Sequence, residues 1–218
     1  MGASVSTIEL YGRLLEHAEA GEHDGRVRTV AGPPATLPLR RWLAPADPID
    51  LLALERAAAP VLDVGCGPGR LLAALAVQGR PATGIDVSPV AVRFARRRGG
   101  HAVRACVFSE RVPAATWGSV LLLDGNIGIG GDPARLLSRT AELLRPGGEA
   151  IVEVDPPGGG ATAVAMRLEG AGAVGPWFAW AQVDADAIVA LARPAGLRVA
   201  GRFEGGGRWF GRLRKASG

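Results

Sequence analysis

The chain has 218 residues, of which 48% are hydrophobic and 21% are charged, and its formal net charge is +4. This composition provides enough apolar sequence for one domain with a sizeable core, and it excludes an intrinsically disordered chain. No apolar run approaches the roughly 20 residues that cross a bilayer, and the N-terminus lacks the pattern of a secretory signal, so we expect no membrane association.

The two cysteines, Cys66 and Cys106, are too few for a disulfide framework and are not spaced as zinc ligands. We therefore expect a cytoplasmic protein with no metal site. Gly2 and Ser6 match the short myristoylation pattern, but a start codon followed by small residues explains them more simply. Arginine supplies almost all of the positive charge, which indicates a GC-rich genome more than a surface for nucleic acid.

Residues 1–59 precede the first strong strand pattern. Leucines at positions 10, 14 and 15 have helical spacing, and a second helix is expected over 49–59, with Asp47 as its cap. We interpret 1–59 as an N-terminal helical cap and 60–218 as the main domain.

From residue 60 onward, short apolar runs alternate with amphipathic runs. The expected strands cover 61–65, 81–88, 101–108, 119–125 and 149–155. The expected helices cover 69–79, 89–98 and 132–144, and 145–148 is expected to be a turn. Such alternation requires parallel strands joined by crossover helices, which is a doubly wound α/β sheet.

The last third of the chain changes character. A helix is expected over 184–196, followed by two strands over 197–204 and 208–215. Three glycines separate these two strands, which predicts a β-hairpin. The stretch GPWFAWAQV at 175–183, after the fifth strand, is expected to be a loop that carries Trp177, Phe178 and Trp180. Large aromatic side chains provide apolar surface and stacking for a planar ligand, although helical spacing of the two tryptophans also fits ordinary core packing.

The strongest motif is VLDVGCGPGR at residues 61–70. Its glycines follow the first strand and open a helix, where the chain must turn sharply and admit a ligand, and where the helix N-terminus offers free N–H groups. The dinucleotide fingerprint fails because its last position is Arg70 instead of Gly or Ala. Asp63 places a carboxylate just before the loop, which suits a cationic ligand better than a pyrophosphate.

A second acidic residue, Asp86, ends the second strand 21 positions after Gly65. A carboxylate at this point can accept hydrogen bonds from both hydroxyls of a ribose. A lone Asp at a strand end is more often a turn residue, but its spacing from the glycine loop favours a ribose site.

With these motifs the chain resembles the class I S-adenosylmethionine-dependent methyltransferases, over about residues 55–155. The resemblance implies a Rossmann-like, doubly wound sheet of seven strands, mostly parallel, with an antiparallel C-terminal hairpin. It also implies S-adenosyl-L-methionine as the cofactor, with the methionine moiety on the glycine loop, the ribose on Asp86 and the adenine just beyond. The residues so assigned are Asp63, Gly65, Cys66, Gly67, Gly69, Asp86, Val87, Cys106 and Val107. Relatives frequently have an Asp where Cys106 stands, and a thiol is a poor acceptor.

The reaction centre is expected beside the fourth strand, in the glycine-rich stretch that contains Asp124 and Asn126. We predict these two as catalytic residues, although a glycine-rich turn explains the stretch equally well. Glu153 and Asp155 are weaker candidates of the same kind. If a base is needed, His17 or His23 on the cap could also act, whereas His101 is given no role.

The sequence thus predicts a methyltransferase that acts on a small-molecule acceptor. One alternative is a nucleic-acid methyltransferase that uses the basic C-terminal hairpin; nucleic acid is the less favoured partner, because the chain has DPPG at 155–158 instead of an Asn-Pro-Pro-aromatic signature. Another is a non-catalytic module that binds S-adenosylmethionine. The identity of the acceptor, the atom methylated and the oligomeric state are left open.

Overall fold

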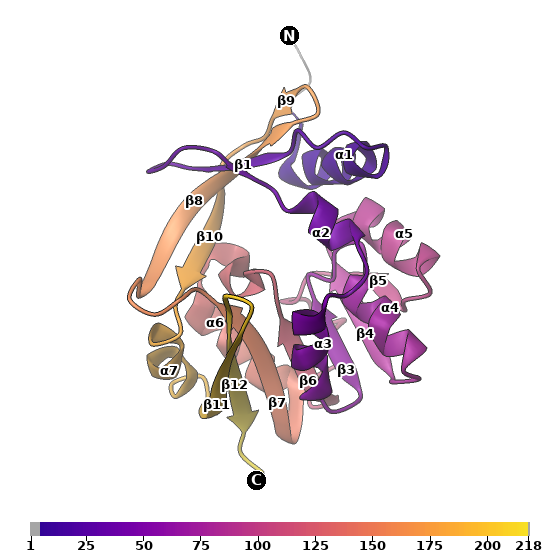
Figure 1. Ribbon diagram of the computed structural model, residues 1–218. Helices are drawn as coiled ribbons and strands as arrows, with labels where there is room; N and C mark the ends of the chain where they lie inside the picture. The colour runs from indigo at the N-terminus through magenta and orange to yellow at the C-terminus, as the bar shows by residue number, and fades with distance from the viewer. Residues whose placement is uncertain (1–4, 218) are drawn as a thin grey trace.

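The computed structural model describes residues 5–217. Its central sheet has seven strands in the order β11-β12-β7-β6-β3-β4-β5 (Figure 1). Their bounds are β3 (Val61–Val64), β4 (Ala82–Asp86), β5 (Ala102–Arg104), β6 (Trp117–Leu122), β7 (Leu144–Val154), β11 (Leu197–Gly205) and β12 (Arg208–Lys215). Strands β3 to β7 pair in parallel, and β12 runs antiparallel to both β7 and β11. The expected fold class, including the C-terminal hairpin, is confirmed.

Helices cover both faces of this sheet. The bounds are α3 (Pro48–Glu55), α4 (Arg70–Val77), α5 (Pro89–Arg97), α6 (Pro133–Leu143) and α7 (Ala187–Ala192). Alternate strand residues face opposite sides, as the period of two in a strand requires. Leu62 and Val120 pack in one core with α6 and α7, whereas Val61 and Leu121 pack in a second core with α3 and α4.

A second, smaller sheet lies beyond the end of the central sheet (Figure 1). Its main path is β10-β8-β1-β2, β9 pairs with β8, and all pairs are antiparallel. The bounds are β1 (Arg26–Thr29), β2 (Ala35–Thr36), β8 (Ala161–Gly170), β9 (Ala173–Val174) and β10 (Phe178–Val183). The expectation of a loop over 175–183 is therefore wrong, because β10 occupies most of that stretch. Strand β8 pairs with β1, which lies far away in the sequence, so local patterns alone do not predict this sheet.

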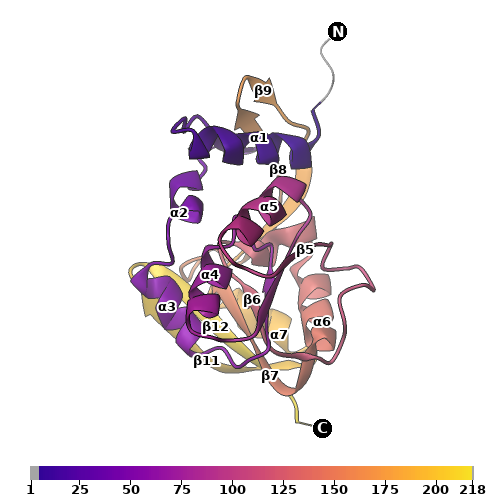
Figure 2. The same cartoon turned by 90° about the vertical axis from the view of Figure 1, so that its right-hand side faces the viewer.

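The N-terminal segment contributes both helices and strands. Helix α1 (Thr7–Glu19) and the short α2 (Leu39–Leu43) flank β1 and β2, so this segment is not purely helical. Figure 2 shows α1 lying across the top of the molecule, between the second sheet and α5. Leu10, Leu14 and Leu15 of this helix are fully buried and pack in one core with Leu168 of β8. The division of the chain into a cap and a main domain at residue 60 stays a prediction.

Several element ends differ from the sequence-based expectation. Strand β5 stops at Arg104, which leaves Cys106 outside it, and β7 begins at Leu144, so the expected turn at 145–148 is part of that strand. Gly2 of the myristoylation pattern lies outside the described residues, whereas Ser6 caps α1 in a reciprocal bond with Glu9. None of the helices in residues 5–217 is long and apolar enough to cross a membrane.

Candidate active site

The glycine loop forms a tight passage between β3 and α4. Gly65, Gly67 and Gly69 all adopt left-handed backbone conformations, with φ of 69°, 52° and 83°, which side chains disfavour. A Cβ at Gly65 would lie 2.7 Å from Nδ2 of Asn126, and one at Gly67 would lie 3.2 Å from the hydroxyl oxygen of Tyr11. The loop therefore needs glycine for its conformation and for the groups packed against it.

Asp86 lies directly beside this loop, because β3 and β4 are parallel neighbours in the sheet. Its side chain is buried and accepts two backbone hydrogen bonds, from the N–H of Gly67 at 3.0 Å and from the N–H of Ser88 at 2.8 Å. Burial raises the pKa of Asp86, and these N–H groups oppose the rise. The structure thus brings together the two motifs that the sequence singled out.

Asp63 is buried behind the loop with little compensation. It is 2% exposed, and among residues 5–217 its Oδ2 atom has no hydrogen-bond partner. Burial raises the pKa of Asp63 to about 7; nearby Asp124, Asp86 and Asp50 add to the rise, whereas Arg70 opposes it. A buried carboxylate without a donor is costly, and a ligand with an ammonium group would supply the missing donor. The environment of Asp63 therefore fits the amino-acid end of S-adenosylmethionine, which carries an ammonium group.

Tyr11 is a site residue that sequence reasoning missed. It projects from α1 so that its hydroxyl lies over Gly67, and its ring packs edge-on against Trp42 with the centroids 6.2 Å apart. Burial, followed by the charge of Asp86, raises the pKa of Tyr11 well above its ordinary value, so the phenol stays neutral. It is the one tyrosine in the chain and sits next to an apolar helix stripe, a signal too general to assign it.

Asn126 and Asp124 lie at the site but are engaged in contacts within the protein. The Nδ2 group of Asn126 donates to the carbonyls of Val64 and Gly65, at 2.8 and 3.2 Å. The carboxylate of Asp124 accepts from Arg41 at 2.7 Å and from Arg70 at 2.5 and 3.1 Å. Both carboxylate oxygens of Asp124 are therefore occupied by guanidinium groups.

These arginines belong to a buried ion-pair cluster that joins the cap, the glycine loop and the C-terminal hairpin. At its centre, Asp50 is fully buried and accepts from Arg41, Arg70 and Arg208. Burial opposes ionisation, but the bonds from Arg70 and Arg208 outweigh it and hold the pKa of Asp50 below its ordinary value. Arg208 also binds Glu153 through two nitrogens, at 2.8 and 2.7 Å. Sequence reasoning identified none of these arginine partners.

The other predicted residues occupy varied positions. Val87 is 42% exposed next to Asp86, and Val107 is buried. Cys66 lies buried in the loop, where burial raises the pKa of its thiol, whereas Cys106 is exposed. Within the described part of the chain, no three His, Cys, Asp or Glu side chains form a group that could hold a metal ion.

Of the weaker candidates, Glu153 accepts from the backbone N–H of Asp124 at 2.7 Å and from Arg208. Asp155 lies just after the end of β7, and partial burial of its carboxyl, followed by the charges of Asp184 and Glu153, raises its pKa. His17 pairs with Glu22, and among residues 5–217 the Nδ1 atom of His23 has no hydrogen-bond partner. His101, to which no role was given, contacts Thr83.

The aromatic stretch divides between two faces of the second sheet. Phe178 and Trp180 alternate along β10 and contact each other edge-on, with their centroids 6.1 Å apart. They share a face with Met166 and Val164 of β8, their partners in the register, and Phe178 packs against the core under α1. Trp177 instead is 44% exposed and stacks with Arg167. The three aromatics are therefore not one cluster.

Comparisons with known proteins agree with this geometry. A family model described as a methyltransferase domain matches residues 39–199. The ubiquinone biosynthesis O-methyltransferase of Xylella fastidiosa (strain 9a5c) is 34% identical over 104 residues, which cover 43% of this chain and 41% of that protein. The chain therefore aligns with less than half the length of this curated relative.

Solved structures share the fold. An S-adenosylmethionine-dependent methyltransferase from Bacteroides fragilis, determined with S-adenosyl-L-homocysteine, has a TM-score of 0.82 at 23% identity, with 98% of each chain covered. The 1,6-didemethyltoxoflavin-N1-methyltransferase of Burkholderia thailandensis has a TM-score of 0.58 at 19% identity, covering 99% of this chain and 93% of that one. Because the family model spans most of the chain, the protein belongs to the class I family of S-adenosylmethionine-dependent methyltransferases.

Proposed function

We propose that this protein transfers a methyl group from S-adenosylmethionine to a small, largely apolar acceptor. The observation that carries the proposal is the buried carboxylate of Asp63 beside the glycine loop and Asp86; its Oδ2 atom has no hydrogen-bond partner among residues 5–217. This arrangement offers an acceptor for an ammonium group and, one strand away, an acceptor for ribose hydroxyls. Val87, Cys106 and Val107 are the proposed neighbours of the adenine.

The cofactor supplies a methyl group on a positively charged sulfur, which is already a good leaving group. The protein then has mainly to hold the two reactants in line and to exclude water. Asn126 and Asp124 contribute by fixing residues 124–131, which we call the reaction loop. Asn126 holds the carbonyls at the end of β3, and Asp124 ties that region to Arg41 and Arg70. Both are therefore proposed as positioning residues, with no proton transfer through Asp124.

The acceptor is proposed to lie against the inner face of the second sheet. The half-buried side chains on that face are apolar or aromatic: Val164, Met166, Phe178 and Trp180. The 3-10 helix η1 (Asn126–Gly131), which follows Asp124, packs directly on β10; a Cβ at Gly128 would meet the indole nitrogen of Trp180. The reaction loop and this apolar face are thus in contact, which favours an apolar organic acceptor.

Calorimetric titration with S-adenosylhomocysteine tests the cofactor site. In Asp86→Asn, the amide would place a donor against the N–H of Gly67 or Ser88. We expect affinity to fall about 30-fold, which corresponds to about 2 kcal/mol for hydrogen bonds to a charged group. Glu55→Gln removes the same charge from an exposed position of α3 and should bind like wild type. Equal affinity of both variants, or no binding by wild type, would contradict the proposal.

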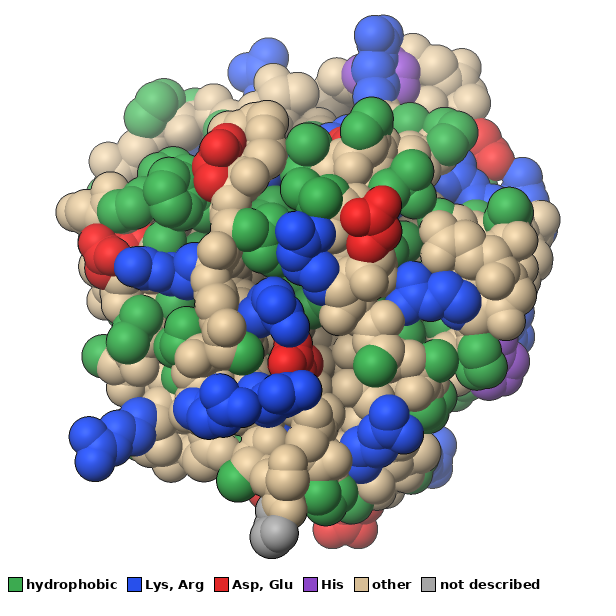
Figure 3. All heavy atoms as spheres, turned by 60° about the horizontal axis from the view of Figure 1, so that its bottom comes forward, with side chains coloured by type: hydrophobic (Ala, Val, Ile, Leu, Met, Phe, Trp, Pro, Cys, Tyr) green, Lys and Arg blue, Asp and Glu red, His purple; other side chains and the backbone are tan. Residues whose placement is uncertain are grey.

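The nucleic-acid alternative gains no support from the C-terminal hairpin. Four of its five arginines are paired with acidic side chains: Arg202 with Asp186, Arg208 with Glu153, and Arg212 and Arg214 with Glu149. Figure 3, in which the lower end of the molecule faces the viewer, shows acidic side chains next to the basic ones. A second measurement distinguishes an enzyme from a non-catalytic module: the release of S-adenosylhomocysteine in the presence of a panel of phenols and aromatic amines. An enzyme releases it with at least one acceptor, and a non-catalytic module with none. A cytoplasmic location stays a prediction.

A further inference from the structure

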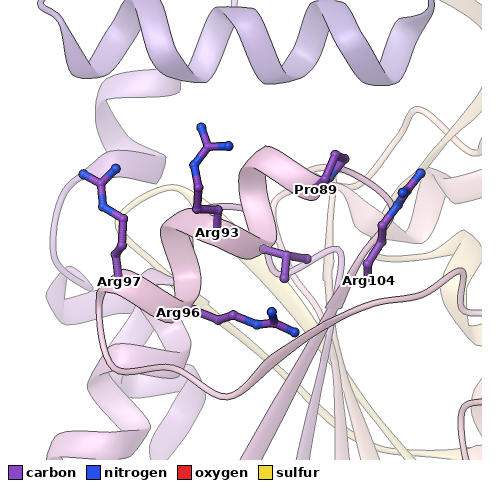
Figure 4. A pocket seen from close by; sticks show the side chains of 6 residues that line it. Pro89, Arg93, Arg96, Arg97 and Arg104 are labelled. Carbon is purple, nitrogen blue, oxygen red and sulfur yellow. The ribbon is translucent and has the colours of Figure 1, made fainter.

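A hollow on the surface lies outside the proposed methyl-transfer site, against α5 and the edge strand β5. It measures about 550 Å³ and is lined by Pro89, Val92, Arg93, Arg96, Arg97 and Arg104. Arg93, Arg96 and Arg97 share one face of α5 through their three- and four-residue spacing, and Arg104 approaches from the strand (Figure 4). No acidic side chain of the described residues lines the hollow.

Two of these arginines are held in place with their outer nitrogens free. The Nε–H of Arg96 donates to the carbonyl of Ala102 at 2.8 Å, and the Nε–H of Arg104 donates to the carbonyl of Val87 at 3.2 Å. Within residues 5–217 neither side chain has an acidic partner. Each bond restrains the side chain and leaves both terminal nitrogens available, so an anion would lose less conformational entropy in binding them.

The other two arginines are partly neutralised by the cap. Figure 4 shows Arg93 and Arg97 pointing toward α1, whereas Arg96 extends along the hollow. Arg93 pairs with Glu16, and Arg97 pairs with Glu19 at 2.7 Å. All four of these side chains are at least 44% exposed, and exposed ion pairs contribute little. The hollow therefore keeps an excess of positive charge, concentrated on Arg96 and Arg104.

We propose that this hollow binds a compact ligand that carries two linked phosphate groups. Guanidinium groups match phosphate oxygens through paired hydrogen bonds, and Arg96 and Arg104 come from two elements that a diphosphate can bridge. The volume lies in the range of ordinary small-molecule sites, and Pro89 and Val92 provide an apolar floor. The phosphate backbone of a nucleic acid requires an extended basic surface, which a single hollow does not offer.

One hydrogen bond connects this hollow to the proposed cofactor site. Arg104 holds the carbonyl of Val87, the residue after Asp86. A ligand in the hollow would therefore be a second ligand, on the ribose side of the molecule and distinct from the methyl acceptor of the second sheet.

Calorimetric titration with inorganic pyrophosphate and with ADP tests the proposal in the whole protein. In the double variant Arg96→Gln/Arg104→Gln, we expect both affinities to fall at least about tenfold, because charge-assisted hydrogen bonds are lost. The control Arg193→Gln/Arg198→Gln removes the same charge from exposed positions and should match wild type. Titration of each protein with S-adenosylhomocysteine reports separately on folding and on the proposed cofactor site.

Three outcomes would overturn the proposal. Wild type could fail to bind pyrophosphate and ADP, or both double variants could lose affinity equally, which would reveal only a general effect of charge. A single-stranded oligonucleotide could also bind at the arginines without displacement by pyrophosphate, which would indicate a nucleic-acid surface instead. If Arg96→Gln/Arg104→Gln is unstable, Arg104→Gln alone is the substitute, with Arg198→Gln as its control.

Discussion

The central sheet and the second sheet bury their strands in different ways. In the central sheet all six residues of β6 are buried, and its parallel strands are joined by single helices or short connections. In the second sheet β8 is exposed or half-buried along most of its length, and its neighbour β1 is far away in the chain: Arg28 binds Glu169, 141 positions later. Both faces of the central sheet are covered by helices. The second sheet has a half-buried face, against which we propose that the acceptor binds.

This difference separates two roles. The central sheet and the ion-pair cluster at its edge fix the glycine loop, Asp63 and Asp86, the residues proposed to position the cofactor. The second sheet offers apolar side chains that can vary without disturbing that framework. We therefore expect substitutions at the central sheet to change stability and cofactor binding, and substitutions in the second sheet to change acceptor recognition with smaller losses of stability.

Asp50→Ala should give the largest effect, on the central side of this comparison. It leaves Arg70 and Arg208 buried without their shared acceptor, and removing one partner of a buried pair costs about 3–5 kcal/mol. The measurement is the free energy of unfolding in urea. Glu55→Ala, an exposed position on the same helix, is the control and should change stability by less than about 0.5 kcal/mol. Similar losses for both variants would show that the cluster does not secure this edge.

Asp63→Asn tests the cost of keeping a carboxylate ready for the cofactor. Because folding raises the pKa of Asp63 to about 7, its protonated form stabilises the fold below the unfolded pKa of about 4. That contribution is lost as the pH rises through 7. The variant does not titrate, so its stability relative to wild type should increase between pH 5 and pH 8 by on the order of 2–3 kcal/mol.

Urea unfolding at both pH values measures this change, and a difference that is independent of pH would contradict it. The same variant should bind S-adenosylhomocysteine more weakly than wild type at pH 8, because it lacks the charge proposed to face the ammonium group. Asp86→Asn provides a comparison at a carboxylate that already has two N–H donors.

Trp180→Ala probes the inner face of the second sheet. The indole is half-buried against Phe178 and η1, so we expect a loss of about 2 kcal/mol, below that of a fully buried aromatic. For an acceptor identified from the panel, KM should rise about tenfold, since apolar contact is lost. The KM for S-adenosylmethionine should stay within about twofold of wild type. An unchanged acceptor KM would remove this face from the proposed site.

Trp177→Ala should give the smallest effect and serves as the matched partner of Trp180→Ala. Trp177 is exposed on the opposite face, where its main contact is a stacked arginine. Such an exposed contact contributes about 0.5–1 kcal/mol. We expect a change of that size in the free energy of unfolding and no change in acceptor KM. A large effect on acceptor KM would show that the outer face of the sheet takes part in recognition.

Local sequence was sufficient for much of the central sheet. The glycine loop, Asp86 at the end of β4 and the capping box that starts at Asp47 all form between neighbours in the chain or between adjacent strands. The hairpin was predictable for the same reason, because Gly206 and Gly207 adopt the positive φ of a tight two-residue turn.

The second sheet and the ion-pair cluster could not be predicted in this way. The four residues of β1 form a strand because β8 lies beside them, and their short polar and apolar alternation has no meaning without that partner. Asp124 illustrates the same point in the site. Its position after β6 indicated a reaction centre, but the two arginines that hold it come from α2 and from the start of α4.

For the central sheet, the sequence by itself determined the order of strands and helices along the chain, the bends at the glycines and the positions of Asp63 and Asp86. These depend on backbone preferences and on apolar periodicity over a few residues. Only the tertiary structure decided that Tyr11 covers Gly67, that Arg41 and Arg70 hold Asp124, and that an apolar sheet faces the reaction loop. Those contacts join segments that are far apart along the chain, so their proximity cannot be predicted from the sequence. The packing of the two sheets and the cap brings these segments together.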